Sequence, residues 1–263
     1  MKRTVQNIIN TIIADVPGAP FPDTIDTLKT GNAGQEVRAV AVTFMATYEV
    51  IEKAIQFGAD LIITHEPTFY SHTDETVWLE YDSVYQAKRH LIDKHNIAIW
   101  RFHDYLHSLQ PDPTITGLLK VLDWTAYALP GQPFMCELLP RSLQDLVLEI
   151  KSKLSLATIR VVGDDQMTCK RIGFLVGATG GRMHIDVFNE WSLDMLVCGE
   201  INEWETNEYV RDASAAGHPK ALIVIGHSVS EEDGMREIIP WLQTRLPEMP
   251  ITFIPTGNSL RSM

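Results

Sequence analysis

The chain has 263 residues, of which 45% are hydrophobic and 21% are charged, and its formal net charge is -12. This length is enough for one large α/β domain or two lobes with a substantial core, and the composition is typical of a globular protein. The acidic charge argues against direct, non-specific nucleic-acid binding, because an acidic surface repels a phosphate backbone.

Cysteine usage and hydropathy suggest where the protein works. Cys136, Cys169 and Cys198 are widely spaced and form no Cys-x-x-Cys pair, which fits a reducing compartment and not a disulfide framework. No apolar run approaches the length that spans a bilayer. We therefore expect a cytoplasmic protein without membrane contact.

Strands and helices alternate in the first half of the chain. In chain order, the hydrophobic pattern predicts an amphipathic helix over 4–14, a strand over 37–42, a helix over 48–57, a strand over 61–63, a helix over 81–94 and a strand over 97–100. Such alternation predicts βαβ units with parallel pairing.

The segment 110–165 is rich in proline and contains one clear amphipathic helix, over 142–154. It reads as a crossover without chemistry of its own. We expect an N-terminal α/β lobe over 1–110, this crossover over 111–165 and a C-terminal α/β lobe over 166–263, folded as one compact unit.

The second half repeats the pattern of the first. We expect a strand over 171–176, a glycine loop over 177–181, a helix or turn up to 188–191, a strand over 194–197, a helix over 203–216 and a strand over 221–225. The fold class is therefore α/β, with two related βαβ-type lobes and mostly parallel sheets. When the two halves are aligned, His65-Glu66 falls near Gly199-Glu200, His103 aligns with His227, and His107 aligns with Glu231.

Histidine and carboxylate residues follow three of the predicted strands, where each strand opens into a loop. The groups are Thr64-His65-Glu66-Pro67, His103-Asp104-Tyr105-Leu106-His107 and His227-Ser228-Val229-Ser230-Glu231. In open α/β sheets this edge binds ligands. Imidazole and carboxylate together suit zinc, iron or manganese, so the pattern favours a metal site. The remaining histidines are interpreted as structural, namely His72, His90, His95, His184 and His218.

Two other features have weaker functional interpretations. The loop Gly177-Ala178-Thr179-Gly180-Gly181 lacks the dinucleotide fingerprint and the P-loop lysine, so a tight turn with positive φ is favoured over a phosphate cradle, which stays an open alternative. Cys198 is interpreted as a buried structural thiol. No Gly-x-Ser-x-Gly motif is present, and serine catalysis has no support.

Residues 51–67 resemble the Nif-three-like proteins, often described as dinuclear metal-centre proteins or type-two GTP cyclohydrolase I homologues, whose usual motif here is His-His-Pro. Gly199-Glu200 and Gly226-His227-Ser228-Val229-Ser230-Glu231 resemble the later part of the family, and the match runs from about residue 4 to about residue 258. The resemblance implies a toroidal homohexamer with two divalent ions per subunit, zinc, iron or manganese. It also implies that the chain lacks the inserted middle domain of longer members.

Carried over residue by residue, the resemblance assigns the metal ligands to His65, Glu66, His107, His227 and Glu231, with His103 near the site. Two positions depart from the family. Glu66 replaces the second histidine of His-His-Pro, and His107 replaces an aspartate. The exchange keeps three imidazoles and two carboxylates.

A two-metal site suggests a metal-dependent hydrolase that acts on a small molecule, either a nucleotide, a phosphoester or a cyclic amide. Glu231 could bridge the ions, and Glu200 could orient a ligand or accept a proton. The alternative is a non-enzymatic metal-binding scaffold or regulatory protein. An open coordination position would separate the two hypotheses.

Overall fold

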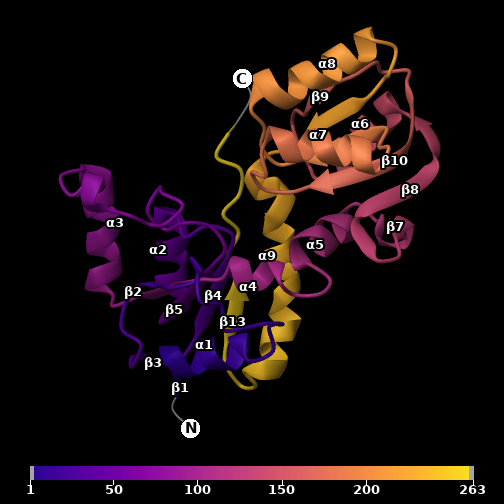
Figure 1. The fold of residues 1–263 in the computed structure, drawn as a ribbon. Coiled ribbons are helices and arrows are strands. Elements are labelled where there is room, and N and C mark those ends of the chain that lie inside the picture. The colour runs from indigo at the N-terminus through magenta and orange to yellow at the C-terminus, as the bar shows by residue number, and fades with distance from the viewer. Residues whose placement is uncertain (1–2, 261–263) are drawn as a thin grey trace. The chain divides into compact units, whose positions relative to one another are not determined.

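The computed structural model describes residues 3–260, which form two compact units (Figure 1). The first unit runs to Pro113 and includes Met235–Thr256, and the second contains Thr114–Gly234 and continues from Gly257. Within the described residues, no helix has both the length and the apolar character needed to cross a membrane. The segment boundaries expected from the sequence stay a prediction.

The first unit is built on a five-stranded sheet in the order β13-β4-β5-β6-β2. Its strands are β2 (Leu28–Thr30), β4 (Val40–Thr43), β5 (Leu61–Thr64), β6 (Ala98–Arg101) and β13 (Ile251–Phe253). Neighbouring strands pair in parallel, except β2, which pairs antiparallel with β6 at the edge. A separate antiparallel pair joins β1 (Arg3–Thr4) to β3 (Glu36–Val37).

Helices cover both faces of this sheet. They are α1 (Val5–Ile13), α2 (Tyr48–Phe57), the 3-10 helix η1 (Val77–Leu79), α3 (Ser83–Lys94), α4 (Asp104–His107) and the second part of α9 (His227–Arg245). Alternate residues of each central strand enter different cores, because successive side chains point to opposite faces. Val40 and Val42 pack with α1, α4 and α9, whereas Ala41 packs with α2 and α3.

The second unit is built on a six-stranded sheet in the order β7-β8-β10-β11-β12-β9. Its strands are β7 (Ala128–Leu129), β8 (Gln132–Ser142), β9 (Arg160–Val162), β10 (Thr168–Leu175), β11 (Met195–Cys198) and β12 (Ala221–Val224). The three adjacent strands β10, β11 and β12 are parallel, and the other three pair antiparallel. The segment predicted as a crossover supplies these antiparallel strands.

The helices of the second unit also lie on both faces of its sheet. They are α5 (Pro113–Val121), the 3-10 helix η2 (Thr125–Tyr127), α6 (Leu143–Lys153), α7 (Gly181–Glu190), the π-helix η3 (Glu203–Asn207) and α8 (Glu208–Ala215), together with the start of α9. α5 and α6 contribute to one core, and α7 and α8 contribute to the other.

The predicted α/β class is confirmed, with parallel strands β4-β5-β6 and β10-β11-β12 in matching order. Two details differ from the sequence expectation. The second sheet is mixed, because β7, β8 and β9 join its edges, and His227 begins the helix α9 and not a loop. The helix places His227 and Glu231 one turn apart on one face.

Candidate metal centre

The ends of β5 and β6 bring three histidines of the first unit together. Thr64 pairs with Arg101 in parallel register, so the residues that follow these strands emerge at the same edge of the sheet. One ligand atom from each of His65, His103 and His107 lies within 4.8 Å of the other two. Their ring centroids are 4.6 to 5.0 Å apart. This spacing fits imidazoles around one divalent ion.

Each of these histidines has its Nδ1 atom beside an oxygen acceptor. The partners are the carbonyl of Phe102 for His65 at 3.2 Å, the carboxylate of Asp104 for His103 at 3.0 Å, and the carboxylate of Asp112 for His107 at 2.8 Å. Donation from Nδ1–H leaves the lone pair of the neutral ring on Nε2. Metal-binding histidines show this same arrangement, in which the second nitrogen is held by a carboxylate or carbonyl. The donor set therefore fits a divalent metal.

Arg101 is a fully buried cation that holds the segment after β5. Its Nε donates to the carbonyl of His65 at 3.0 Å, and its Nη1 donates to the carbonyl of His72. Its Nη2 lies 3.5 Å from Glu66 Oε2. Glu66 Oε1 also lies 3.9 Å from His103 Nε2. Arg101 thus fixes both the backbone of His65 and the carboxylate of Glu66.

Asp26 orients His103 through the backbone. Its two carboxylate oxygens accept from the N–H groups of His103 and Tyr105, each at 2.8 Å, at the start of α4. Burial raises the pKa of Asp26 against the opposing effect of these bonds. Burial, assisted by the neighbouring His65, also lowers the pKa of His103 to about 4. The ring of His103 is therefore neutral at physiological pH, which is the state that binds metals.

The second unit carries a pair of candidate ligands on α9. His227 Nε2 lies 3.0 Å from Glu231 Oε2, and His227 Nδ1 lies 2.9 Å from Glu200 Oε1. Glu231 is buried, whereas the Glu200 side chain is 56% exposed. Glu200 follows β11, as the internal repeat predicted, and it is in contact with a predicted ligand.

The glycine loop makes room for this pair. Gly177 has a φ of 68°, and a methyl group there would lie 2.5 Å from Glu231 Oε1 and 3.4 Å from His227 Nε2. The N–H of Gly177 donates to Ser230 Oγ at 3.0 Å. A methyl group at Gly199 would lie 2.7 Å from the same hydroxyl oxygen. The loop is a positive-φ turn, as predicted, and its backbone packs directly on α9.

The structure thus gathers His65, Glu66 and His107 in the first unit and His227 and Glu231 in the second. It adds His103 to the first group and places the His72 ring 6.2 Å from the His103 ring, although the sequence interpretation gave His72 a structural role. Two other side chains that were interpreted as structural, His184 and Cys198, are buried. His184 is bonded to the hydroxyls of Thr179 and Thr206, and burial raises the pKa of Cys198 to about 12.

Arg101, Asp26 and Asp112 were not identified as site residues from the sequence. The sequence could have indicated Arg101, because a charged residue directly after the apolar run Ile97-Ala98-Ile99-Trp100 is unusual. Asp26 had none, because it lies 77 residues before His103 in the chain.

The chain is similar to several known proteins. The family model described as Duf34/NIF3 (NGG1p interacting factor 3) matches residues 25–259. A Buchnera aphidicola protein named GTP cyclohydrolase 1 type 2 homolog is 22% identical over 227 residues, which cover 84% of this chain and 85% of that protein. A Clostridium perfringens protein of the same name is 23% identical over 238 residues and 86% of each chain.

Solved structures show the same fold. A Bacillus cereus protein related to NIF3 has a TM-score of 0.78 at 15% identity, with 100% of this chain and 99% of that chain covered. A Staphylococcus aureus protein has a TM-score of 0.75 at 20% identity, with 99% of each chain covered.

Proposed function

Because the chain belongs to the Duf34/NIF3 family, we propose that it binds two divalent metal ions per subunit and acts as a metal-dependent hydrolase. The proposed ligands are His65, Glu66, His107, His227 and Glu231, and the ions are zinc, iron or manganese. The proposed substrate is a small molecule with a hydrolysable nucleotide, phosphoester or cyclic amide bond. The name GTP cyclohydrolase 1 type 2 homolog of two relatives is consistent with the last of these.

The anchored imidazoles carry this proposal. His65, His107 and His227 each have Nδ1 beside a carbonyl or carboxylate oxygen, at 2.8 to 3.2 Å, and so does His103. A purely structural histidine needs no such uniform arrangement, whereas a metal ligand needs a fixed tautomer and a fixed ring orientation. His103 is a further candidate ligand, because its ligand atom is grouped with those of His65 and His107.

Divalent ions, when bound, would lower the pKa of a water molecule and stabilise charge on a reacting oxygen. The residues of the chain have separate tasks. Arg101 and Asp26 keep the first group in position through the contacts described above. Glu200 is suited to accept a proton, because its carboxylate contacts His227 while more than half of its side chain remains exposed.

We further propose that the protein is a cytoplasmic homohexamer. The assembly rests on the family resemblance. The compartment rests on cysteine usage, because Cys136, Cys169 and Cys198 are all free thiols in the structure.

The test uses the exchanged pair Glu66 and His107. We propose that both bind the same ion, with their roles reversed relative to the family. Glu66→Ala and His107→Ala should each lose about one metal ion per subunit. Removal of a ligand should lower metal affinity by more than the roughly 10–100-fold seen when a residue that only supports a ligand is changed. The double variant Glu66→His with His107→Asp should recover metal binding. His90→Ala, at an exposed histidine of α3, is the matched control.

Metal content is measured by elemental analysis of purified protein, together with a hydrolase screen with and without added Mn²⁺, Zn²⁺ or Fe²⁺. Full metal content in both single variants would show that these two assignments are wrong, and His103 or Asp104 would then be tested. Metal binding without turnover of any substrate would favour the scaffold hypothesis over the hydrolase.

A further inference from the structure

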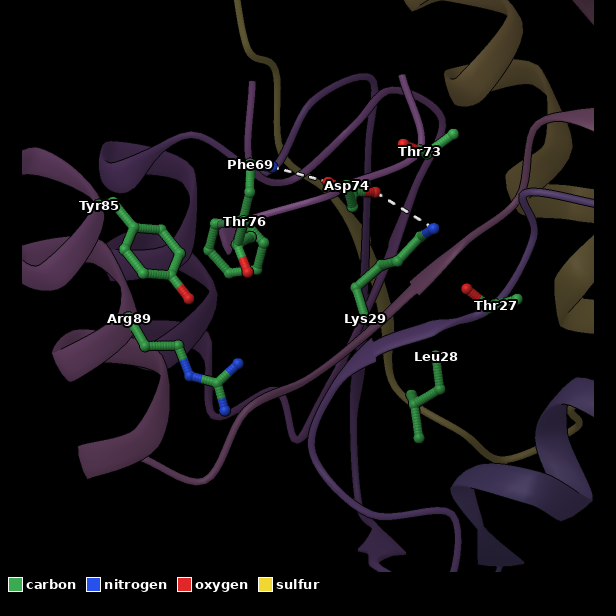
Figure 2. Close-up of a pocket in the computed structure, with 9 residues that line it drawn as sticks. All are labelled: Thr27, Leu28, Lys29, Phe69, Thr73, Asp74, Thr76, Tyr85 and Arg89. Atoms are coloured by element: carbon green, nitrogen blue, oxygen red, sulfur yellow. Dashed lines mark hydrogen bonds and ion pairs between the residues drawn. The ribbon is translucent and has the colours of Figure 1, made fainter. Parts of the chain in front are cut away.

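The first unit contains a polar pocket of about 240 Å³ whose lining includes none of the proposed metal ligands (Figure 2). Its walls come from three elements. Lys29 belongs to β2, Tyr85 and Arg89 belong to α3, and Asp74 and Thr76 belong to the segment between β5 and α3. Tyr85 and Arg89 are four residues apart on α3, so both side chains reach the pocket from one face of the helix.

The acidic group of this pocket is paired with a lysine of the same pocket. Asp74 Oδ1 accepts from the N–H of Phe69 at 2.7 Å, and Asp74 Oδ2 lies 3.2 Å from Lys29 Nζ. The side chains of Lys29 and Asp74 are only 7% and 4% exposed. This buried pair forms a rigid wall, and the charge of Asp74 is neutralised before any ligand arrives.

The opposite wall offers hydrogen-bond donors. Figure 2 shows the hydroxyls of Tyr85 and Thr76 and the guanidinium of Arg89 turned toward the same space. Arg89 uses Nε to bind Asp93 at 2.9 Å. Among the described residues, no hydrogen bond engages the terminal nitrogens of Arg89 or the two hydroxyls. These donors are therefore available to an acceptor in the pocket.

We propose that this pocket binds a compact small molecule through an anionic phosphate or carboxylate group. The guanidinium fork matches either anion in a bidentate manner, and the two hydroxyls supply further donors. The lining contains Lys29 and Arg89; Lys29 is paired with Asp74, whereas Arg89 is paired with Asp93 through Nε alone, so its terminal nitrogens supply the positive group that faces the pocket. The volume is below the roughly 300–1,000 Å³ of sites for drug-sized ligands, which favours a small metabolite.

The experiment titrates the full-length protein with inorganic phosphate, glycerol 3-phosphate and succinate by isothermal titration calorimetry. Arg89→Gln should weaken binding by roughly tenfold or more, because a charge-assisted hydrogen bond is lost. Tyr85→Phe should weaken it by a few-fold, since it removes one neutral donor. Arg182→Gln is the matched control, because Arg182 also pairs with an aspartate four residues later but belongs to α7 of the second unit and does not line the pocket. The affinity of the Arg182→Gln variant for the three anions should be unchanged.

His107→Ala separates this pocket from the metal centre, because phosphate also binds metal ions. Unchanged anion affinity in His107→Ala, together with the loss in Arg89→Gln, supports the pocket even if the proposed metal function fails. Binding that is lost in His107→Ala but kept in Arg89→Gln overturns the proposal, and so does a failure of all three anions to bind. Succinate binding alone assigns a carboxylate ligand, and binding of glycerol 3-phosphate or phosphate assigns a phosphate ligand.

Discussion

The two units hold their candidate ligands by different physical means. In the first unit, charged side chains hold both the backbone and the side chains of the candidate ligands. Arg101 is buried beneath the segment of His65 and Glu66, and Asp112 holds the ring of His107. In the second unit, His227 and Glu231 lie one turn apart on α9, and a glycine backbone closes over them. The ligands of the first unit (the first group) therefore depend on paired buried charges. The ligands of the second unit (the second group) depend on the space that Gly177 leaves for them.

This difference predicts which substitutions each group tolerates. A site that rests on buried charges fails when one charge loses its partner, because an uncompensated buried ion is costly. A site that rests on the close approach of a glycine fails when a methyl group is added, because the methyl group takes the space of the ligand side chain and displaces it. Each group should therefore be insensitive to the change that disrupts the other.

The largest effect is expected for Arg101→Met in the first unit. The substitution removes the cation beside the buried Glu66 and two hydrogen bonds to backbone carbonyls. We expect the free energy of unfolding to fall by about 3–5 kcal/mol, the range found when one partner of a buried ion pair is removed. Urea denaturation followed by circular dichroism measures this loss.

Arg38→Met is the control for that measurement. Arg38 also pairs with an aspartate, Asp60, but its side chain is 77% exposed, so its loss should lower the free energy of unfolding far less than the loss of Arg101. If Arg101→Met is no more destabilising than Arg38→Met, the first group does not rest on buried charge.

The central strands of both sheets were predictable from the sequence because they are short apolar runs between helices. β4, β5, β6, β11 and β12 are buried on both faces, and so are residues 172–174 of β10; such strands are continuous hydrophobic stretches in the sequence. The edge strands β2, β9 and β13 were not predicted. Each has three residues, and so few residues show no periodicity until a neighbouring strand supplies their hydrogen bonds.

The candidate site shows the same limit. His65, His107 and His227 were found because each follows a predictable strand, which places it at the ligand-binding edge. The helix that carries His227 was missed. α9 contains Gly234 and Pro240, and both residues argue against a helix of 19 residues. The supporting carboxylates Asp26 and Asp112 could not be assigned, since their roles depend on contacts made only in the folded chain.

A smaller effect is expected for Gly177→Ala in the second unit. The new methyl group would lie 2.5 Å from Glu231 Oε1, and the residue would keep a φ of 68°. The positive φ alone costs roughly 1–2 kcal/mol for a residue other than glycine. Displacement of Glu231 should add the loss of bound metal, measured by elemental analysis alongside thermal unfolding.

Gly217→Ala isolates the backbone cost. Gly217 has a φ of 83°, and a methyl group there would meet nothing within 4 Å. This variant should lose the same roughly 1–2 kcal/mol but keep its full metal content. Equal metal content in Gly177→Ala and Gly217→Ala would contradict a role for the glycine loop in seating Glu231.

The smallest effect, and the most direct comparison of the two groups, concerns the carboxylates that hold the rings. Asp112 binds His107 Nδ1 at 2.8 Å and Glu200 binds His227 Nδ1 at 2.9 Å, so the geometry is nearly the same. Their exposure differs, because the Asp112 side chain is 25% exposed and that of Glu200 is 56% exposed. Asp112→Asn and Glu200→Gln each keep an oxygen that can accept from Nδ1–H, and each removes one negative charge.

Metal affinity, measured by competition with a chromophoric chelator, should therefore fall more in Asp112→Asn than in Glu200→Gln. The loss in Asp112→Asn is expected within the roughly 10–100-fold typical of residues that support metal ligands. Water screens the charge of the more exposed Glu200, so its removal should weaken binding by about tenfold or less. A larger loss in Glu200→Gln would show that Glu200 itself contacts the metal. The second group would then depend on the charge of Glu200 as well as on the space left by Gly177.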